Sequence, residues 1–169
     1  DYPYKLKVSS YIQKKGDVDF LLKDEIELFK KANLSGILTT NYDQMLKRLF
    51  PDMSRVIGQE DLIKSGSFGL NQIIKLHGCT SRPSSLVITK EDYAKFKESN
   101  EYLAAKLLTL FIEYPIIFMG YSIDDVNIRR VLHSISKILY TNNIDRDICS
   151  FLIVRWNTDI GEDDFQPYE

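Results

Sequence analysis

Short apolar runs alternate with longer amphipathic stretches along most of the chain. The runs cover residues 36–40, 73–76, 115–119 and 151–154, and they are rich in β-branched side chains. Continuous apolar runs of this length are typical of strands that are covered on both faces, as in a parallel sheet. Residues 86–89 are a weaker candidate for a further strand. The pattern therefore predicts a largely parallel sheet with a buried centre.

The stretches between these runs have helical periodicity. Residues 122–140 are the clearest case, because apolar side chains recur there at intervals of three and four and Asn142 and Asn143 follow as stop signals. Further helices are expected over residues 17–32, 43–50 and 101–114, and from residue 89 onward. Strands that alternate with helices predict an α/β fold in which helices sandwich the sheet.

Composition and charge indicate a single folded domain over residues 1–169. The chain is 44% hydrophobic and 27% charged, and its formal net charge is −2. A nearly neutral chain has no field that gathers nucleic acid or anionic lipid, and no run approaches the roughly 20 apolar residues that span a bilayer. We therefore expect neither nucleic acid nor a membrane as a partner. Cys79 and Cys149 form no C-x-x-C pair, which favours reduced thiols in a cytoplasmic protein without a metal site.

The first two predicted strands end in polar residues. Thr40, Asn41 and Asp43 follow the first strand, and His77 and Gly78 follow the second. In open α/β sheets, ligands bind at the carboxyl ends of the strands, and a glycine there lets a ligand approach the backbone. Structural interpretations stay open for both motifs. Asn41 would then be a turn residue, Asp43 a helix cap, and His77 the partner of a neighbouring carbonyl group.

A third motif follows the strand at residues 115–119. Gly120 permits a close backbone approach, and Ser122 is placed to cap the next helix or to offer its hydroxyl and amide groups to a ligand. Asp124 and Asp125 would repel a phosphate, which favours neutral hydroxyls such as those of a ribose. The alternative is a serine cap followed by first-turn acids. Because the carboxyl ends of parallel strands meet at one edge, we expect the three motifs to converge.

Taken in order, the three motifs resemble those of the sirtuin-like domains of bacterial defence proteins, which are distant relatives of the sirtuin deacylases. The motifs are residues 40–43, 77–78 and 120–122, and the resemblance runs from about residue 37 to residue 135. It implies a Rossmann-like sheet of the DHS-like NAD/FAD-binding type, with NAD+ as ligand or substrate. It also implies a glycohydrolase that splits NAD+ into nicotinamide and ADP-ribose in antiviral defence.

The resemblance assigns roles to single residues. His77 would be the base or polarising group at the ribose hydroxyls, and Asn41 would hold the ribose or orient the attacking water. An imidazole accepts a proton near neutral pH, and an amide positions a nucleophile without ionising. Asp43 would recognise the nicotinamide carboxamide. The NAD-binding positions that the resemblance implies are, in chain order, Thr40, Asp43, Gly78, Gly120 and Ser122, the last two at the adenosine-side ribose.

Two features depart from the family pattern. Residues 79–114 lack the four-cysteine zinc module of the deacylases, so we expect no zinc and favour water as the acceptor. The glycine-rich turn that follows the first strand of the family is also missing, since residues 1–15 contain no glycine. We therefore expect either a domain that is incomplete at its N-terminus and belongs to a longer protein, or a degenerate member of the family. The alternatives to an enzyme are a non-catalytic sensor of NAD or ADP-ribose and a module through which the longer protein forms a homo-oligomer.

Overall fold

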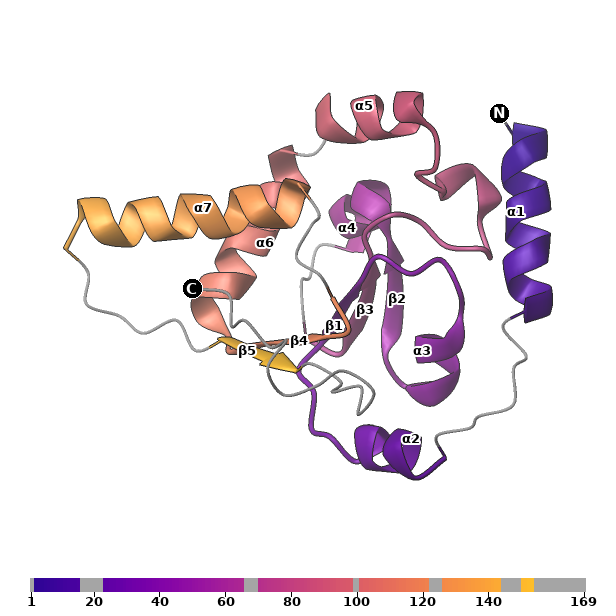
Figure 1. The fold of residues 1–169 in the computed structure, drawn as a ribbon, viewed down its shortest axis with the longest axis horizontal. Helices are drawn as coiled ribbons and strands as arrows, with labels where there is room; N and C mark the ends of the chain where they lie inside the picture. The colour runs from indigo at the N-terminus through magenta and orange to yellow at the C-terminus, as the bar shows by residue number, and fades with distance from the viewer. Residues whose placement is uncertain are drawn as a thin grey trace, which may run out of the picture. The chain divides into compact units, whose positions relative to one another are not determined.

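The structure is a computed structural model that describes residues 2–15, 23–65, 70–98, 101–121, 126–143 and 150–153. The chain divides into two compact units, Asp1–Lys106 and Leu107–Glu169. Both units combine strands and helices, as Figure 1 shows. Among the described residues, no helix is both long enough and apolar enough to cross a membrane.

A parallel sheet forms the centre of the first unit. Its strand order is β1 (Ile37–Thr39), β3 (Gln72–Lys75) and β2 (Ser54–Ile57), so β3 has a neighbour on both sides. β3 is buried along its whole length, whereas β1 is half-buried. The predicted α/β fold with a parallel, Rossmann-like sheet is confirmed. The apolar pattern does not predict β2, because Ser54 and Arg55 make this edge strand half polar.

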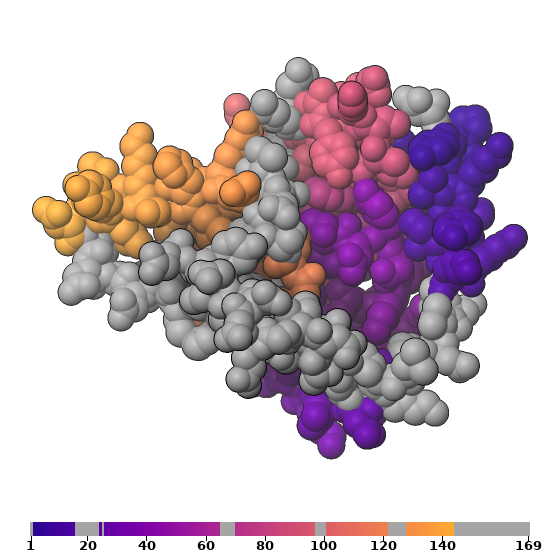
Figure 2. Space-filling view, viewed as in Figure 1, coloured from indigo at the N-terminus to yellow at the C-terminus, as the bar shows by residue number. Residues whose placement is uncertain are grey.

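Helices flank this sheet. They are α1 (Tyr2–Lys15), α2 (Lys23–Lys30), α3 (Met45–Leu49), α4 (Gly58–Ser65), α5 (Lys90–Glu98) and the first part of α6 (Glu101–Glu113). α1 packs against the short 3-10 helix η1 (Pro83–Ser85), and it is the indigo column at one side of the unit in Figure 2. The pattern predicts neither α1 nor α4. The apolar positions of α1 are scattered, and Tyr2, Tyr4 and Tyr11 are exposed.

The strand expected at residues 86–89 is wrong. The chain there is irregular and follows η1. Val87 donates its N–H to the His77 carbonyl, but the N–H groups of Ile88 and Thr89 both donate to the side chain of Asp92. Because a carboxylate takes these donors, the apolar run cannot continue as a ladder beside another strand.

The second unit contains the parallel pair β4 (Ile116–Met119) and β5 (Ser150–Ile153) and the helix α7 (Val126–Thr141). Both strands lie where apolar runs predict them. α7 buries Ile128, Val131 and Ile135, which are spaced three and four residues apart along one face. The helical periodicity predicted over residues 122–140 is therefore confirmed from residue 126 onward.

Candidate functional site

The first two polar motifs lie at the same edge of the sheet in the first unit. β1 and β3 are parallel neighbours, and Thr39 is in register with Lys75. Asn41 lies two residues after Thr39, and His77 lies two residues after Lys75. Both residues therefore leave the sheet at the same level. The Leu76 N–H donates to the Thr39 carbonyl over 2.9 Å and continues the pairing past the strands.

The loop after β1 carries Asn41 on its surface. The Asn41 side chain is exposed, and its backbone N–H donates to Oγ1 of Thr39 over 3.1 Å. Asp43 is half-buried, and its Oδ1 accepts the N–H of Met45, the first residue of α3, over 2.8 Å. The N-cap residue of α3 is Gln44, so the cap expected at Asp43 is wrong by one position, although the Asp43 carboxylate does bond the first residue of the helix. Its second carboxylate oxygen gives it further capacity as an acceptor.

A buried lysine joins this loop to the central strand. Lys75 is 1% exposed, and its Nζ donates to the carbonyl of Asn41 over 2.7 Å and to the carbonyl of Asp43. Burial lowers the pKa of Lys75, and the Arg55 cation lowers it further, against the opposing effects of Cys79 and Asp43. Carbonyl oxygens thus replace water around this ammonium group.

His77 lies beneath α5. Its side chain is 7% exposed, and the rings of Tyr93 and Phe96 meet the imidazole edge-on with centroids 5.7 and 5.3 Å away. Its carbonyl accepts the N–H of Val87 over 3.0 Å. The imidazole is therefore largely enclosed by aromatic side chains of one helix.

Tyr42 connects the two motifs. Its hydroxyl donates to the Val87 carbonyl over 2.6 Å, and its own carbonyl accepts the N–H of Thr80 over 2.8 Å. Burial and the neighbouring hydroxyl of Tyr93 raise the pKa of Tyr42 to about 12. The phenol therefore stays neutral at physiological pH and keeps its donor bond.

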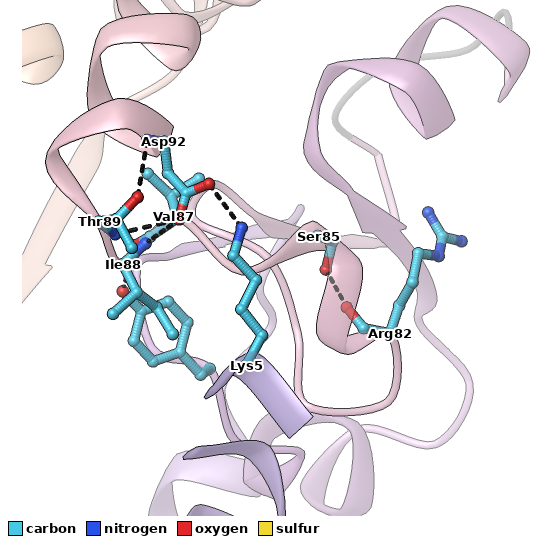
Figure 3. A network of polar contacts seen from close by, with 8 residues as sticks. Lys5, Arg82, Ser85, Val87, Ile88, Thr89 and Asp92 are labelled. Carbon is cyan, nitrogen blue, oxygen red and sulfur yellow. Dashed lines mark hydrogen bonds and ion pairs between the residues drawn. The ribbon is translucent and has the colours of Figure 1, made fainter. Parts of the chain in front are cut away.

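The start of α5 is fixed by Asp92, as Figure 3 shows. Asp92 accepts the N–H groups of Ile88 and Thr89 and donates its own N–H to Oγ1 of Thr89, which is a capping box. It also pairs with Nζ of Lys5 on α1 over 2.5 Å. Burial acts to raise the pKa of Asp92, but Lys5 and the two amides outweigh it and hold the pKa well below its usual range. This acid therefore attaches α1 to the helix that covers His77.

Gly78 serves the packing of the protein itself. Its φ is +94°, and a Cβ built there would lie 2.2 Å from the carbonyl oxygen of Ser85. The close backbone approach that a glycine allows is thus used by the C-terminal end of η1. This observation explains the glycine without a ligand and leaves its predicted contact with NAD a prediction.

The sequence does not reveal the cations around this edge of the sheet. Arg55 of β2 donates to Oε1 of Gln44 over 3.0 Å, and its Nη1 lies 4.0 Å from Sγ of the buried Cys79. One sequence feature does indicate a buried cation. Lys75 is a charged residue within an apolar run, and a buried charge requires partners. Within the described part of the chain, no group of three His, Cys, Asp or Glu side chains is placed to hold a metal ion.

The third motif belongs to the second unit. Gly120 follows β4 with a φ of +56°, and no atom lies within 4 Å of the position of a Cβ. Ser122 lies outside the described residues. The convergence of the third motif with the first two therefore stays a prediction.

Thr40 belongs to the first motif, in the first unit. It is half-buried and directly follows the last residue of β1.

The family model described as SIR2-like domain matches residues 35–164, a span that contains β1, β3 and all three motifs. The chain belongs to the SIR2-like domain family. The resemblance to sirtuin-like domains is thereby confirmed. The SIR2-like match also places the Asn41 loop and the His77 segment inside one family unit with the strands that carry them.

Curated relatives of this SIR2-like domain carry names from NAD metabolism and defence. It is 28% identical over 142 residues to NAD(+) hydrolase ThsA of Cytobacillus dafuensis. This alignment covers 80% of this chain and 28% of the relative. It is 23% identical over 143 residues to Defense-associated sirtuin 2 of Bacillus subtilis. This alignment covers 73% of this chain and 14% of the relative. The chain thus spans less than a third of either relative.

Proposed function

We propose that this domain, within its full-length protein, binds NAD+ and hydrolyses the bond between nicotinamide and ribose. The observation that carries the proposal is the common level at which Asn41 and His77 leave adjacent parallel strands of a SIR2-like domain. Relatives named NAD(+) hydrolase support the substrate and the reaction, and the name of a defence-associated sirtuin supports a role in bacterial defence.

The residue types suit this reaction. The C–N bond breaks with its electron pair going to the nicotinamide ring, which leaves as a neutral molecule, and positive charge develops on the ribose. The oxygen of a water molecule then bonds to the ribose carbon and the water loses a proton. Asn41 would orient that water from its exposed position, and His77 would accept a proton from a ribose hydroxyl or polarise it. The products are nicotinamide and ADP-ribose.

NAD+ turnover by the full-length protein tests the proposal, with nicotinamide release as the measured quantity. His77→Ala and Asn41→Ala are each expected to lower turnover by at least about 100-fold, the usual effect of losing a proton-transfer or positioning group. His133→Ala and Asn33→Ala are matched controls, because both side chains are exposed. They should stay within about twofold of the wild type. Equal turnover in all five proteins would remove both assignments.

A second candidate is a non-catalytic module that binds NAD or ADP-ribose. The enclosure of His77 by Tyr93 and Phe96 favours it, because an imidazole with little open surface also suits a purely structural role. Calorimetry on the full-length protein separates the two candidates. Binding of NAD+ and ADP-ribose without nicotinamide release would support sensing, whereas release that depends on His77 supports hydrolysis.

A further inference from the structure

Three consecutive carbonyl groups of the Asn41 loop accept hydrogen bonds from residues 75–80, a segment that begins at the last residue of β3. The carbonyls of Asn41 and Asp43 accept from Nζ of Lys75, and the carbonyl of Tyr42 between them accepts from the N–H of Thr80. The loop is thus shaped against the same segment that contains His77. The backbone of Asn41 is held from the inside, while its side chain faces solvent.

A lysine at this position is costly for stability. Every residue of β3 is buried, and an ammonium that leaves water loses its solvation unless other groups replace the water. An apolar residue would fill the same space without that cost, and such replacements of buried charges are often neutral or stabilising. What Lys75 supplies and an apolar residue does not is a fixed donor that turns two peptide carbonyls toward one point.

We infer that Lys75 is a positioning residue for cleavage of the nicotinamide–ribose bond, acting through the Asn41 loop. By holding the carbonyls of Asn41 and Asp43, it fixes the direction in which the Asn41 amide leaves the sheet edge. The inference rests on the proposed function, since Asn41 matters only if it meets the reacting ribose or water. A displacement of about 1 Å at such a group is enough to cost about 100-fold in rate.

The test is a double-mutant cycle in the full-length protein with Lys75→Met and Asn41→Ala. Methionine keeps the length of the side chain and removes its donors. If Lys75 acts through Asn41, Lys75→Met lowers kcat by about 10- to 100-fold in the wild-type background and has no further effect once Asn41 is alanine. An equal loss in both backgrounds would overturn the inference, because a merely structural role does not depend on Asn41.

Lys47→Met is the matched control. Nζ of Lys47 also donates to two backbone carbonyls, those of Pro51 and Met53, both over 2.7 Å, but in a different loop. Its kcat should stay within about twofold of the wild type. If circular dichroism shows that Lys75→Met is unfolded, the same cycle is run with Lys75→Gln, whose side-chain NH₂ group is still a hydrogen-bond donor.

Hydrogen exchange gives a readout that does not depend on activity. In folded Lys75→Met, the amides of residues 41–45 should exchange faster than in the wild type, while those of β2 stay protected. Unchanged exchange in the loop would overturn the inference even in an active protein. If the wild type releases no nicotinamide, the proposed function fails separately, and the exchange data still show whether Lys75 holds the loop.

Discussion

At the scale of single residues, Gly78 leaves less room for a side chain than Gly58 or Gly120, the other two described glycines with a positive φ. We expect Gly78→Ala to lower the free energy of unfolding by at least about 2 kcal/mol, because a Cβ would meet a backbone oxygen and a non-glycine residue is strained at this φ. Gly58→Ala is the control, since its φ is +64° but no atom lies within 4 Å of its Cβ position. That variant should lose only about 1 kcal/mol. Equal losses on denaturant unfolding would contradict the packing role of Gly78.

The sequence reveals some of these residues and conceals others for a physical reason. Asn41 and His77 are recognisable because polar residues directly follow apolar strands, and that position alone predicts a ligand edge. Lys75 carries the same polarity within a strand, but its two carbonyl partners lie more than 30 residues earlier in the chain. Only the pairing of β1 with β3 brings them together, so the role of Lys75 is a property of the tertiary structure.

At the scale of elements, Asp92 determines how α5 begins and how α1 is attached. Asp92→Asn removes a charge that Lys5 and two amides stabilise, and we expect a loss of about 1–3 kcal/mol at pH 7, as for hydrogen bonds to charged groups. Glu91→Gln changes the neighbouring, exposed acid on the same helix and should cost less than about 0.5 kcal/mol.

The pH dependence of this difference has a definite sign. The folded-state pKa of Asp92 is below the unfolded value of about 3.9, so its stabilisation is present above that pH and is lost as the pH falls through the folded-state pKa. The stability gap between wild type and Asp92→Asn should therefore begin to narrow as the pH falls below about 4, the unfolded-state pKa, and keep narrowing toward the folded-state pKa. Denaturant unfolding at several pH values checks this, and a constant gap down to pH 2 would contradict the assignment.

Continuous apolar runs correctly predict β1, β3, β4 and β5 as strands. The burial expected on both faces holds for β3, whereas β1 is half-buried and β4 exposes Ile117 and Met119. The apolar pattern does not predict β2, because this edge strand has polar positions. Residues 86–89 have the composition of a strand, but the N–H groups of Ile88 and Thr89 donate to the Asp92 side chain instead of to a neighbouring strand. Both failures have a tertiary cause. An apolar pattern predicts neither which strand lies at the edge of the sheet nor which backbone N–H groups donate to a side chain.

At the scale of the whole molecule, hydrolysis predicts where the new oxygen atom comes from. If the full-length protein uses water as the acceptor, turnover in ¹⁸O-labelled water should place one ¹⁸O atom on the released ADP-ribose, because the attacking oxygen bonds to the ribose carbon. Mass spectrometry of the product checks this. Nicotinamide release without free, labelled ADP-ribose would show that another acceptor takes the ribosyl group.

The proposed reaction requires one site for the ribose of NAD+, shared by the Asn41 loop and the His77 segment. A crystal structure of the full-length protein with ADP-ribose would show whether such a site exists. We expect the ribose that carried nicotinamide to lie within hydrogen-bond distance of both the Asn41 amide and the His77 imidazole. ADP-ribose bound elsewhere, or with that ribose out of reach of both side chains, would contradict it.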